Sequence, residues 1–203
     1  DAMLSEVTQT IMAAGYFKYK DQNGDKKIDD EDLTYLGTPI PKLQTGLDFG
    51  LNWKNLDVSL SLYGQFGNKI LNAKRMNRGV FPDGNYDLNF YENRWTKDNP
   101  SDTYPSSEAY GNAYTQRAND FFVEPGWFIR IQNIQVGYTF TDFGKLNFLN
   151  SARIYLAAQR PLSIFTYNGF TTEVGGSPIA SGIDTSTHPL QAIYTLGVKL
   201  NFK

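Results

Sequence analysis

The stretch of sequence that decides the fold reads LQTGLDFGLNWKNLDVSLSLYGQFG and spans residues 43–67. Apolar and polar residues alternate in it with a period of two, first over residues 43–53 and again over residues 56–67. Such alternation is typical of strands that are apolar on one side only, and Lys54-Asn55 between them is a candidate two-residue turn. Each predicted strand has about 11 residues, which is long for a globular protein and suits a tilted membrane strand.

Three more strands are predicted, over residues 127–140, 152–159 and 190–202. In the first of these, Ile129 and Ile131 are out of phase with the alternation of the residues that follow, which predicts a bulge or a change of environment near Gln132. The last strand alternates cleanly, with only Ile193 out of place. The sequence therefore predicts an all-β chain with five antiparallel strands.

The connections between these strands alternate in length. Lys54-Asn55 and residues 141–150 are short, whereas residues 68–126 and 166–189 are long. In outer-membrane barrels the short turns face the periplasm and the long loops face outward, whereas a soluble sandwich has turns every 8–12 residues. The alternation favours the barrel and predicts a periplasmic C-terminus. Because single-chain bacterial barrels have an even number of strands, at least about eight, we expect the chain to be part of a larger barrel.

The composition agrees with a barrel and excludes other classes. Aromatic residues make up 15% of the chain, which also has 18 glycines and a mean hydropathy of −0.44. A transmembrane barrel combines these properties, because its strands are apolar on one face and its rims carry aromatic girdles. The net charge of −2 with scattered cations argues against nucleic acid as a partner, and the absence of cysteine excludes disulfides and thiol chemistry. With one histidine, His188, the sequence contains no nucleophile–base set, so no enzyme activity is predicted.

An acidic loop between residues 21 and 32 has the spacing of a calcium-binding loop. Calcium prefers several oxygen ligands that converge from one tight turn, so we predict a structural Ca²⁺ there. Lys26 stands where an EF-hand loop has glycine, and the alternative is a solvated acidic turn. The predicted ligands are the side chains of Asp21, Asn23, Asp25, Asp29 and Asp32 and the backbone carbonyl of Lys27.

Several segments, taken in order, resemble one known family. Residues 15–21 (GYFKYKD), the acidic loop after them and residues 37–42 look like a hallmark of the SusC/RagA family of TonB-linked outer-membrane proteins. Residues 128–138 resemble the family's LRLKNITLGY strand, residues 153–159 its RVYVSGQN strand, and residues 194–202 its closing strand. The chain departs from the family at Lys26, at Arg160-Pro161, where Asn-Leu is usual, and at Lys203, which follows the usual terminal aromatic residue.

The resemblance implies the last five strands, with their long extracellular loops, of a transmembrane barrel with about 22 strands and an N-terminal plug. Residues 1–42 would be an extracellular loop region with the calcium-type loop, and residues 43–203 the C-terminal strands and loops of the barrel domain. The whole protein would import glycans or peptides across a Gram-negative, Bacteroidetes-like outer membrane. Its partners would be outer-membrane lipids, a SusD-like surface lipoprotein and TonB, which would bind through the missing N-terminal part.

Two further sets of residues are candidates for contact with a substrate. Polar residues on the inner side of the barrel would form a channel wall or bond to the plug; these are Gln44, Asp48, Tyr63, Gln65, Gln191 and Lys199. In the longest loop, Tyr91, Trp95 and Tyr104 would stack on a sugar or pack within the loop. The alternative function, from another class, is a secreted calcium-stabilised β-domain that binds a ligand or partner.

Overall fold

A computed structural model describes residues 3–4, 13–78, 85–110, 118–144, 148–175 and 181–203. The chain forms two compact units. The first contains residues 1–37, 71–124 and 183–186, and the second contains residues 38–70, 125–182 and 187–203. The sequence-predicted division at residue 42 stays a prediction.

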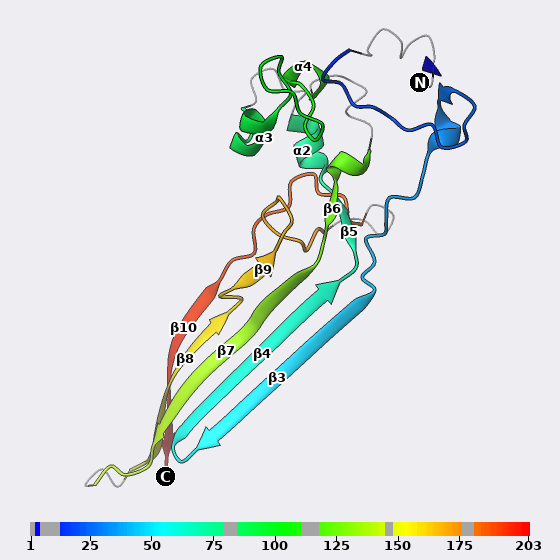
Figure 1. Ribbon diagram of the computed structural model, residues 1–203. Helices are drawn as coiled ribbons and strands as arrows, with labels where there is room; N and C mark the ends of the chain where they lie inside the picture. Colours follow the sequence, from blue (N-terminus) through cyan, green and yellow to red (C-terminus); the bar gives the residue numbers. More distant parts are fainter. Residues whose placement is uncertain (1–2, 5–12, 79–84, 111–117, 145–147, 176–180) are drawn as a thin grey trace. The chain divides into compact units, whose positions relative to one another are not determined.

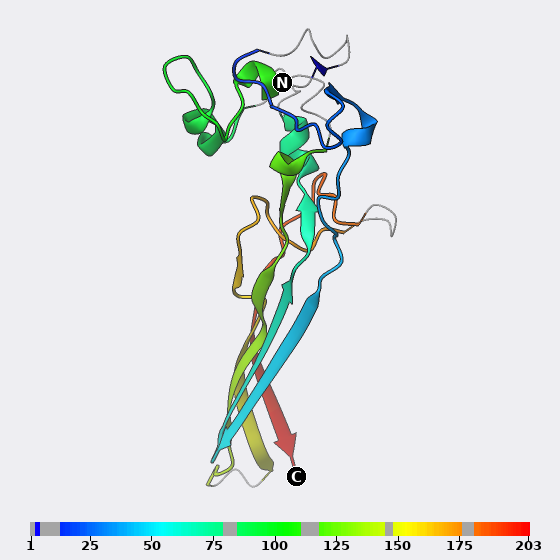
Figure 2. The same cartoon turned by 45° about the vertical axis from the view of Figure 1, so that its right-hand side comes forward.

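The second unit is built on one antiparallel sheet (Figure 1). Its long strands are β3 (Leu43–Trp53), β4 (Leu56–Phe66), β7 (Phe128–Phe140), β8 (Leu149–Gln159) and β10 (Ile193–Phe202). They pair in chain order, so each strand lies beside the strand that follows it, as in a meander. The sheet is twisted, as Figure 2 shows from a second direction. The five predicted strands are confirmed, although β10 begins at Ile193 rather than Leu190 and β8 begins three residues before Ala152.

The predicted irregularity near Gln132 is a β-bulge. Ser61 pairs with Asn133 and Leu62 with Ile131, so Gln132 has no partner on β4. The extra residue reverses the phase of β7 and returns Ile129 and Ile131 to the side of the sheet that carries Ile134. This explains why the two isoleucines are out of phase in the sequence. On the other side of β7, Arg160, with a φ of 52°, ends the pairing of β8, and the short strand β9 (Ser163–Phe165) resumes it.

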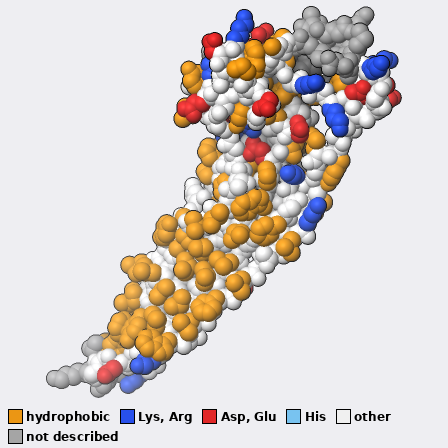
Figure 3. All heavy atoms as spheres, in the orientation of Figure 1, with side chains coloured by type: hydrophobic (Ala, Val, Ile, Leu, Met, Phe, Trp, Pro, Cys, Tyr) orange, Lys and Arg blue, Asp and Glu red, His pale blue; other side chains and the backbone are white. Residues whose placement is uncertain are grey.

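The two faces of the sheet differ in polarity. Residues directly opposite each other on neighbouring strands share a face, and following the register across the sheet puts nearly all large apolar side chains on one side. Figure 3 shows this face covered by apolar side chains. Its residues are highly exposed for apolar groups: Leu47, Leu156 and Leu196 are 62%, 63% and 70% exposed. We call this side of the sheet the apolar face and the other side the polar face.

The first unit consists of short elements around a small aromatic core. They are β1 (Met3–Leu4), β2 (Lys27–Ile28), η1 (Asp30–Asp32), α2 (Ala73–Arg78), α3 (Leu88–Asn93), α4 (Ser107–Tyr110) and η2 (Asp120–Phe122). Strands β1 and β2 pair in parallel, and β5 (Lys69–Leu71) pairs with β6 (Val123–Pro125) in a separate small sheet. The core is formed by Phe90, Tyr110 and Phe122, each at most 1% exposed.

The sequence predicts no regular element in the long segment of residues 68–126. Its described residues contain three short α-helices besides η2 and the short strands β5 and β6. Each has six residues or fewer, too short to show a period of 3.6 in the sequence. Tyr110 and Phe90, whose ring centroids are 4.4 Å apart, hold α3 and α4 together. Among the described residues, no helix has the length and apolarity that crossing a membrane requires.

Candidate functional site

The polar face of the sheet brings together five of the six residues predicted to face the lumen. Gln44 lies opposite Gln65, and Tyr63 lies opposite Gly46. Asp48, opposite Ser61, belongs to the same face, and the register carries that face across β7 and β8 to Lys199 on β10. Gln191 is different, because it precedes the first residue of β10 and the period of two does not apply to it.

An ion pair that the sequence analysis missed crosses this face. Arg153 on β8 donates from Nε to Oδ1 of Asp57 on β4, at 2.9 Å, and a second bond joins its Nη2 to Oδ2. The side chain passes over β7 at Gly137, where there is no Cβ in its way. The guanidinium also lies 4.9 Å from the ring centroid of Tyr155. The only signal in the sequence was that opposite charges occupy polar-face positions of two strands that are not neighbours.

A second paired arginine lies near the other end of the polar face. Arg130, 5% exposed, forms a two-bond ion pair with Glu173, with N–O distances of 2.8 and 2.9 Å. Its Nε donates to Gln132 at 3.0 Å, so the buried charge is fully paired. Glu173 belongs to the segment after β9, and the pair ties that segment to β7. Sequence reasoning had no means to find this pair because 43 residues separate the partners.

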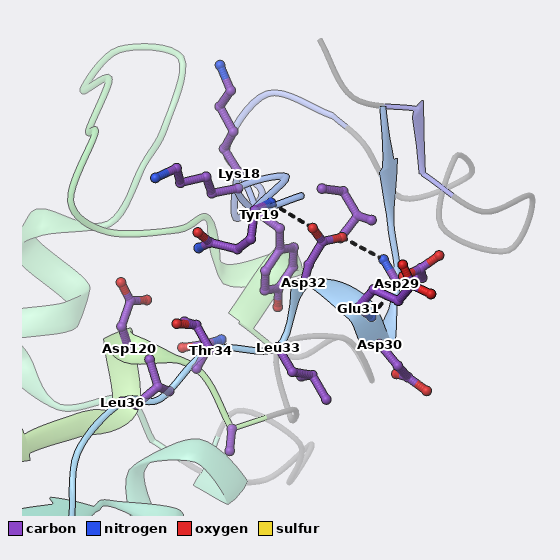
Figure 4. Close-up of a pocket in the computed structure, with 15 residues that line it drawn as sticks. Lys18, Tyr19, Asp29, Asp30, Glu31, Asp32, Leu33, Thr34, Leu36 and Asp120 are labelled. Carbon is purple, nitrogen blue, oxygen red and sulfur yellow. Dashed lines mark hydrogen bonds between the residues drawn. The ribbon is translucent and has the colours of Figure 1, made fainter. Parts of the chain in front are cut away.

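The acidic loop is organised by hydrogen bonds from the backbone to carboxylates. Asp21 accepts from the N–H groups of Gly24 and Lys26, at 2.6 and 2.8 Å. Asp32 accepts from Gln22 at 2.7 Å and from Asp29 at 2.9 Å, as Figure 4 shows. Lys26 has a φ of 70°, so a lysine adopts the left-handed conformation that favours glycine in such a loop.

These bonds affect the charge state of the loop. The backbone N–H groups of Gln22 and Asp29 stabilise the charged form of Asp32 and lower the pKa of that carboxyl below its ordinary value. Each Asp32 oxygen accepts one hydrogen bond from a backbone N–H group. In the part of the chain that the structure describes, no three Asp, Glu, His or Cys side chains are grouped so that they could hold a metal ion. Calcium binding by Asp21, Asn23, Asp25, Lys27, Asp29 and Asp32 therefore stays a prediction.

The three loop aromatics have different surroundings. Tyr91 is 56% exposed, with the Arg94 guanidinium 4.1 Å from its ring centroid. Tyr104 packs edge-on against Phe121, and its hydroxyl accepts a hydrogen bond from Asn89 at 2.8 Å. Trp95 lies over Gly15, where a Cβ would meet its ring. Two of the three rings therefore pack within the first unit, and Tyr91 presents the most exposed face.

The geometry defines a class of protein: a two-faced antiparallel sheet with one apolar exposed side and one polar, ion-paired side is the wall of a transmembrane barrel. The solved structures agree. The chain has the fold of one part of the RagAB peptide importer in the 'closed-closed' state, with a TM-score of 0.66 and 23% identity over 81% of this chain and 18% of that one. The 'open-open' state gives a TM-score of 0.63 and 24% identity over 81% and 17% of the two chains.

The sequence comparisons point to a particular group of barrels. No protein-family model matches the chain. TonB-dependent receptor P26 of Formosa agariphila is 31% identical over 198 residues, which cover 93% of this chain and 20% of the receptor. TonB-dependent receptor SusC of Bacteroides thetaiotaomicron is 28% identical over 91% of this chain and 17% of SusC. The chain is thus SusC/RagA-like, as its sequence predicts, and spans about a fifth of the length of these receptors.

Proposed function

We propose that the chain forms part of the barrel wall of a TonB-dependent outer-membrane transporter that imports glycans or peptides together with a SusD-like lipoprotein. The observation that carries this proposal is the difference between the two faces of one continuous sheet. In a barrel wall the apolar face contacts lipid and the polar face lines a wet lumen. The outer membrane would be its location and lipid its most extensive partner.

The exposed apolar face supports contact with lipid. It extends over all five long strands, and in β10 the side chains of Tyr194, Leu196 and Val198 are 73%, 70% and 62% exposed. Soluble monomers rarely expose a contiguous apolar patch of more than a few hundred Å². Contact with lipid removes the free-energy cost of exposing these side chains to water, because hydrocarbon tails are as apolar as the side chains.

The polar face supports a wet lumen. Each of the five long strands carries one charged group on this face, and two of these groups, Asp57 and Arg153, are paired with each other. The other three are Asp48, Arg130 and Lys199. A charge directed into lipid near the bilayer centre costs about 2–4 kcal/mol in a barrel, whereas in a wet lumen it stays hydrated. The comparisons support a role in import, since one solved neighbour is a peptide importer and SusC is a TonB-dependent receptor.

Uptake by cells tests the proposal. Cells that produce the whole receptor should accumulate fluorescently labelled oligosaccharides or peptides from a mixed pool, and cells that lack it should not. Dissipating the proton gradient should abolish the accumulation, since TonB draws on that gradient. Uptake that is the same without the receptor would contradict the proposal.

The alternative is a secreted β-domain that binds a ligand or partner, and it predicts a different solution behaviour. Such a domain should be monodisperse in buffer without detergent. A barrel wall with this exposed apolar face should require detergent or lipid. Light scattering of the purified protein with and without detergent separates the two classes.

A further inference from the structure

A small cavity lies on the polar face at the end of the sheet where β8 is interrupted. Its volume is about 240 Å³. That is below the roughly 300–1,000 Å³ of sites that enclose drug-sized ligands, so it suits one ring of a larger ligand. It is lined by β7, by the segment from Arg160 through β9 to Thr172, and by the residues just before β10. Leu190 and Ala192, which the sequence predicts to belong to the last strand, precede β10 and line this cavity.

The two arginines of the cavity are in different states. Arg130 is buried, and its guanidinium donates hydrogen bonds to Glu173 and Gln132. Arg160 is half-buried, and among the described residues its guanidinium has no ion pair or hydrogen bond. Residues 176–180, which follow the Glu173 segment, include no acidic residue. Among the residues that the structure describes, acidic side chains neutralise one of the two cations of the cavity and not the other.

The backbone holds Arg160 in an unfavourable conformation. Its φ of 52° lies in the left-handed region, which is unfavourable for a non-glycine residue. The hydrogen bond from its N–H to the carbonyl of Gln132, at 3.2 Å, fixes the position, and Pro161 prevents the ladder from continuing at the next residue. Backbone strain at a positively charged residue beside a cavity is typical of a functional site.

The remaining lining supplies a hydroxyl group and an aromatic ring. Ser163 contributes a hydroxyl, and the buried residues Thr171 and Thr172 close the wall. The ring of Phe170, 60% exposed, contributes a flat apolar face, whereas Phe128 is only 1% exposed and has no open face. A free guanidinium binds a carboxylate with two parallel hydrogen bonds, hydroxyls bind sugar hydroxyls, and a ring stacks on the apolar face of a pyranose. Together these groups match an acidic sugar better than an acidic peptide side chain, which has no ring to stack.

We propose that this cavity binds a uronic-acid residue of the transported glycan, with the carboxylate on Arg160. The proposal rests on the transport function proposed above and names the chemical class of its substrate. The Arg130–Glu173 pair ties the segment that carries Thr171 and Thr172 to β7.

Binding to the whole receptor in detergent tests the proposal. A trimer of galacturonic acid and its carboxyl-reduced neutral counterpart would be compared by titration calorimetry, with triglutamate as a third ligand. We expect the wild type to bind the acidic trimer at least about 10-fold more tightly than the neutral one. Arg160→Gln should abolish this preference, and Arg160→Lys should retain part of it.

Lys54→Gln is the matched control, since Lys54 is also a cation with a positive φ, of 54°, and lies at a distant turn. It should leave the preference unchanged. Equal binding of the two trimers, no binding of either, an unaltered preference in Arg160→Gln, or a preference for triglutamate would each overturn the proposal. None of these results would contradict a role in transport, because the uptake of neutral glycans or peptides by cells is measured separately.

Discussion

At the residue scale, Gly137 decides whether the Arg153–Asp57 pair can form. A Cβ at Gly137 would overlap the guanidinium of Arg153, whereas a Cβ at Gly50, on the same polar face, would meet nothing within 4 Å. The two glycines therefore serve as a matched pair, one under a side chain and one in open space. Glycine is otherwise unfavourable in a strand, so replacing it with alanine at an open position should be neutral or stabilising.

We expect Gly137→Ala to destabilise the receptor and Gly50→Ala not to. The loss should be small, about 1 kcal/mol, because the side chains of Arg153 and Asp57 are 23% and 31% exposed and water screens the pair. The unfolding temperature of the detergent-solubilised receptor measures this loss of stability. If Gly137→Ala unfolds at the wild-type temperature, the pair contributes nothing to stability.

The acidic loop should depend on pH through Asp32. Because its pKa is lower in the folded loop than in the unfolded chain, its contribution to stability is complete above the ordinary value of 3.8. That contribution is lost as the pH falls from there through the folded pKa. Hydrogen exchange at the amides of Gln22 and Asp29, corrected for intrinsic rates, should show protection that declines below about pH 4. In Asp32→Asn protection should be weak at every pH, and a pH-dependent protection in that variant would rule out Asp32 as its source.

Calcium binding by the same loop is a separate prediction. If the loop binds Ca²⁺, millimolar calcium should raise the unfolding temperature of the wild type relative to chelator, since a ligand that binds only the folded state stabilises it. Asp25→Ala should remove this gain. Asp30→Asn is the control, because Asp30 lies in η1 and is outside the predicted ligand set. An unfolding temperature that is the same in calcium and in chelator would end the idea.

At the element scale, β10 provides the sharpest test of which face contacts lipid. Leu196 lies opposite Leu156 on the apolar face, and Thr195 lies opposite Ala157 on the polar face. Arginine at Leu196 should cost roughly 2–4 kcal/mol at the bilayer midplane, whereas Thr195→Arg should be tolerated in a wet lumen. Heat-modifiable gel mobility after assembly into membranes measures the folded fraction of each variant. The reverse order would mean that the apolar face is not the lipid face.

The elements also show how far the sequence determines the fold. The strands β3 and β4 follow directly from a period of two, and the phase change at Ile129 and Ile131 predicts the bulge at Gln132. The start of β10 was wrong by three residues, because alternation continues in the segment before it, where no partner strand continues the ladder. A pattern of side chains specifies the face of a residue only where hydrogen bonds to a neighbouring strand are present.

The interruption between β8 and β9 shows the same limit at the candidate site. The sequence marks Arg160-Pro161 as unusual, but the left-handed Arg160 and the cavity beside it depend on the register of β7. The Arg130–Glu173 and Arg153–Asp57 pairs join residues 43 and 96 positions apart. Contacts at such separations arise from strand order and bulge position together, neither of which is contained in a local motif.

At the scale of the whole molecule, the connections between strands fall into two groups. The turn Lys54-Asn55 and residues 141–148 join strands at one end of the sheet, and the long segments after β4 and β8 leave from the other. The first unit gathers three separate parts of the chain, which no local pattern predicts. Its aromatic core includes contacts such as Phe17 with Phe121, with ring centroids 5.2 Å apart.

The last prediction concerns the orientation of the wall in the membrane. Because long loops of bacterial barrels face outward, we expect Ser101 on the cell surface and Lys54 in the periplasm. This chain has no cysteine, so Ser101→Cys and Lys54→Cys each introduce a single thiol into it. A membrane-impermeant maleimide applied to intact cells should label Ser101→Cys and leave Lys54→Cys unlabelled.

Permeabilising the outer membrane should make Lys54→Cys reactive, which shows that its thiol is accessible and only shielded by the membrane. Gly144→Cys, in the other short connection, should behave like Lys54→Cys because an antiparallel meander returns every second connection to the same side. Labelling of Lys54→Cys but not of Ser101→Cys in intact cells would invert the assignment. Different behaviour of Lys54→Cys and Gly144→Cys would contradict the meander as a membrane-spanning wall, because both connections would then no longer lie on one side.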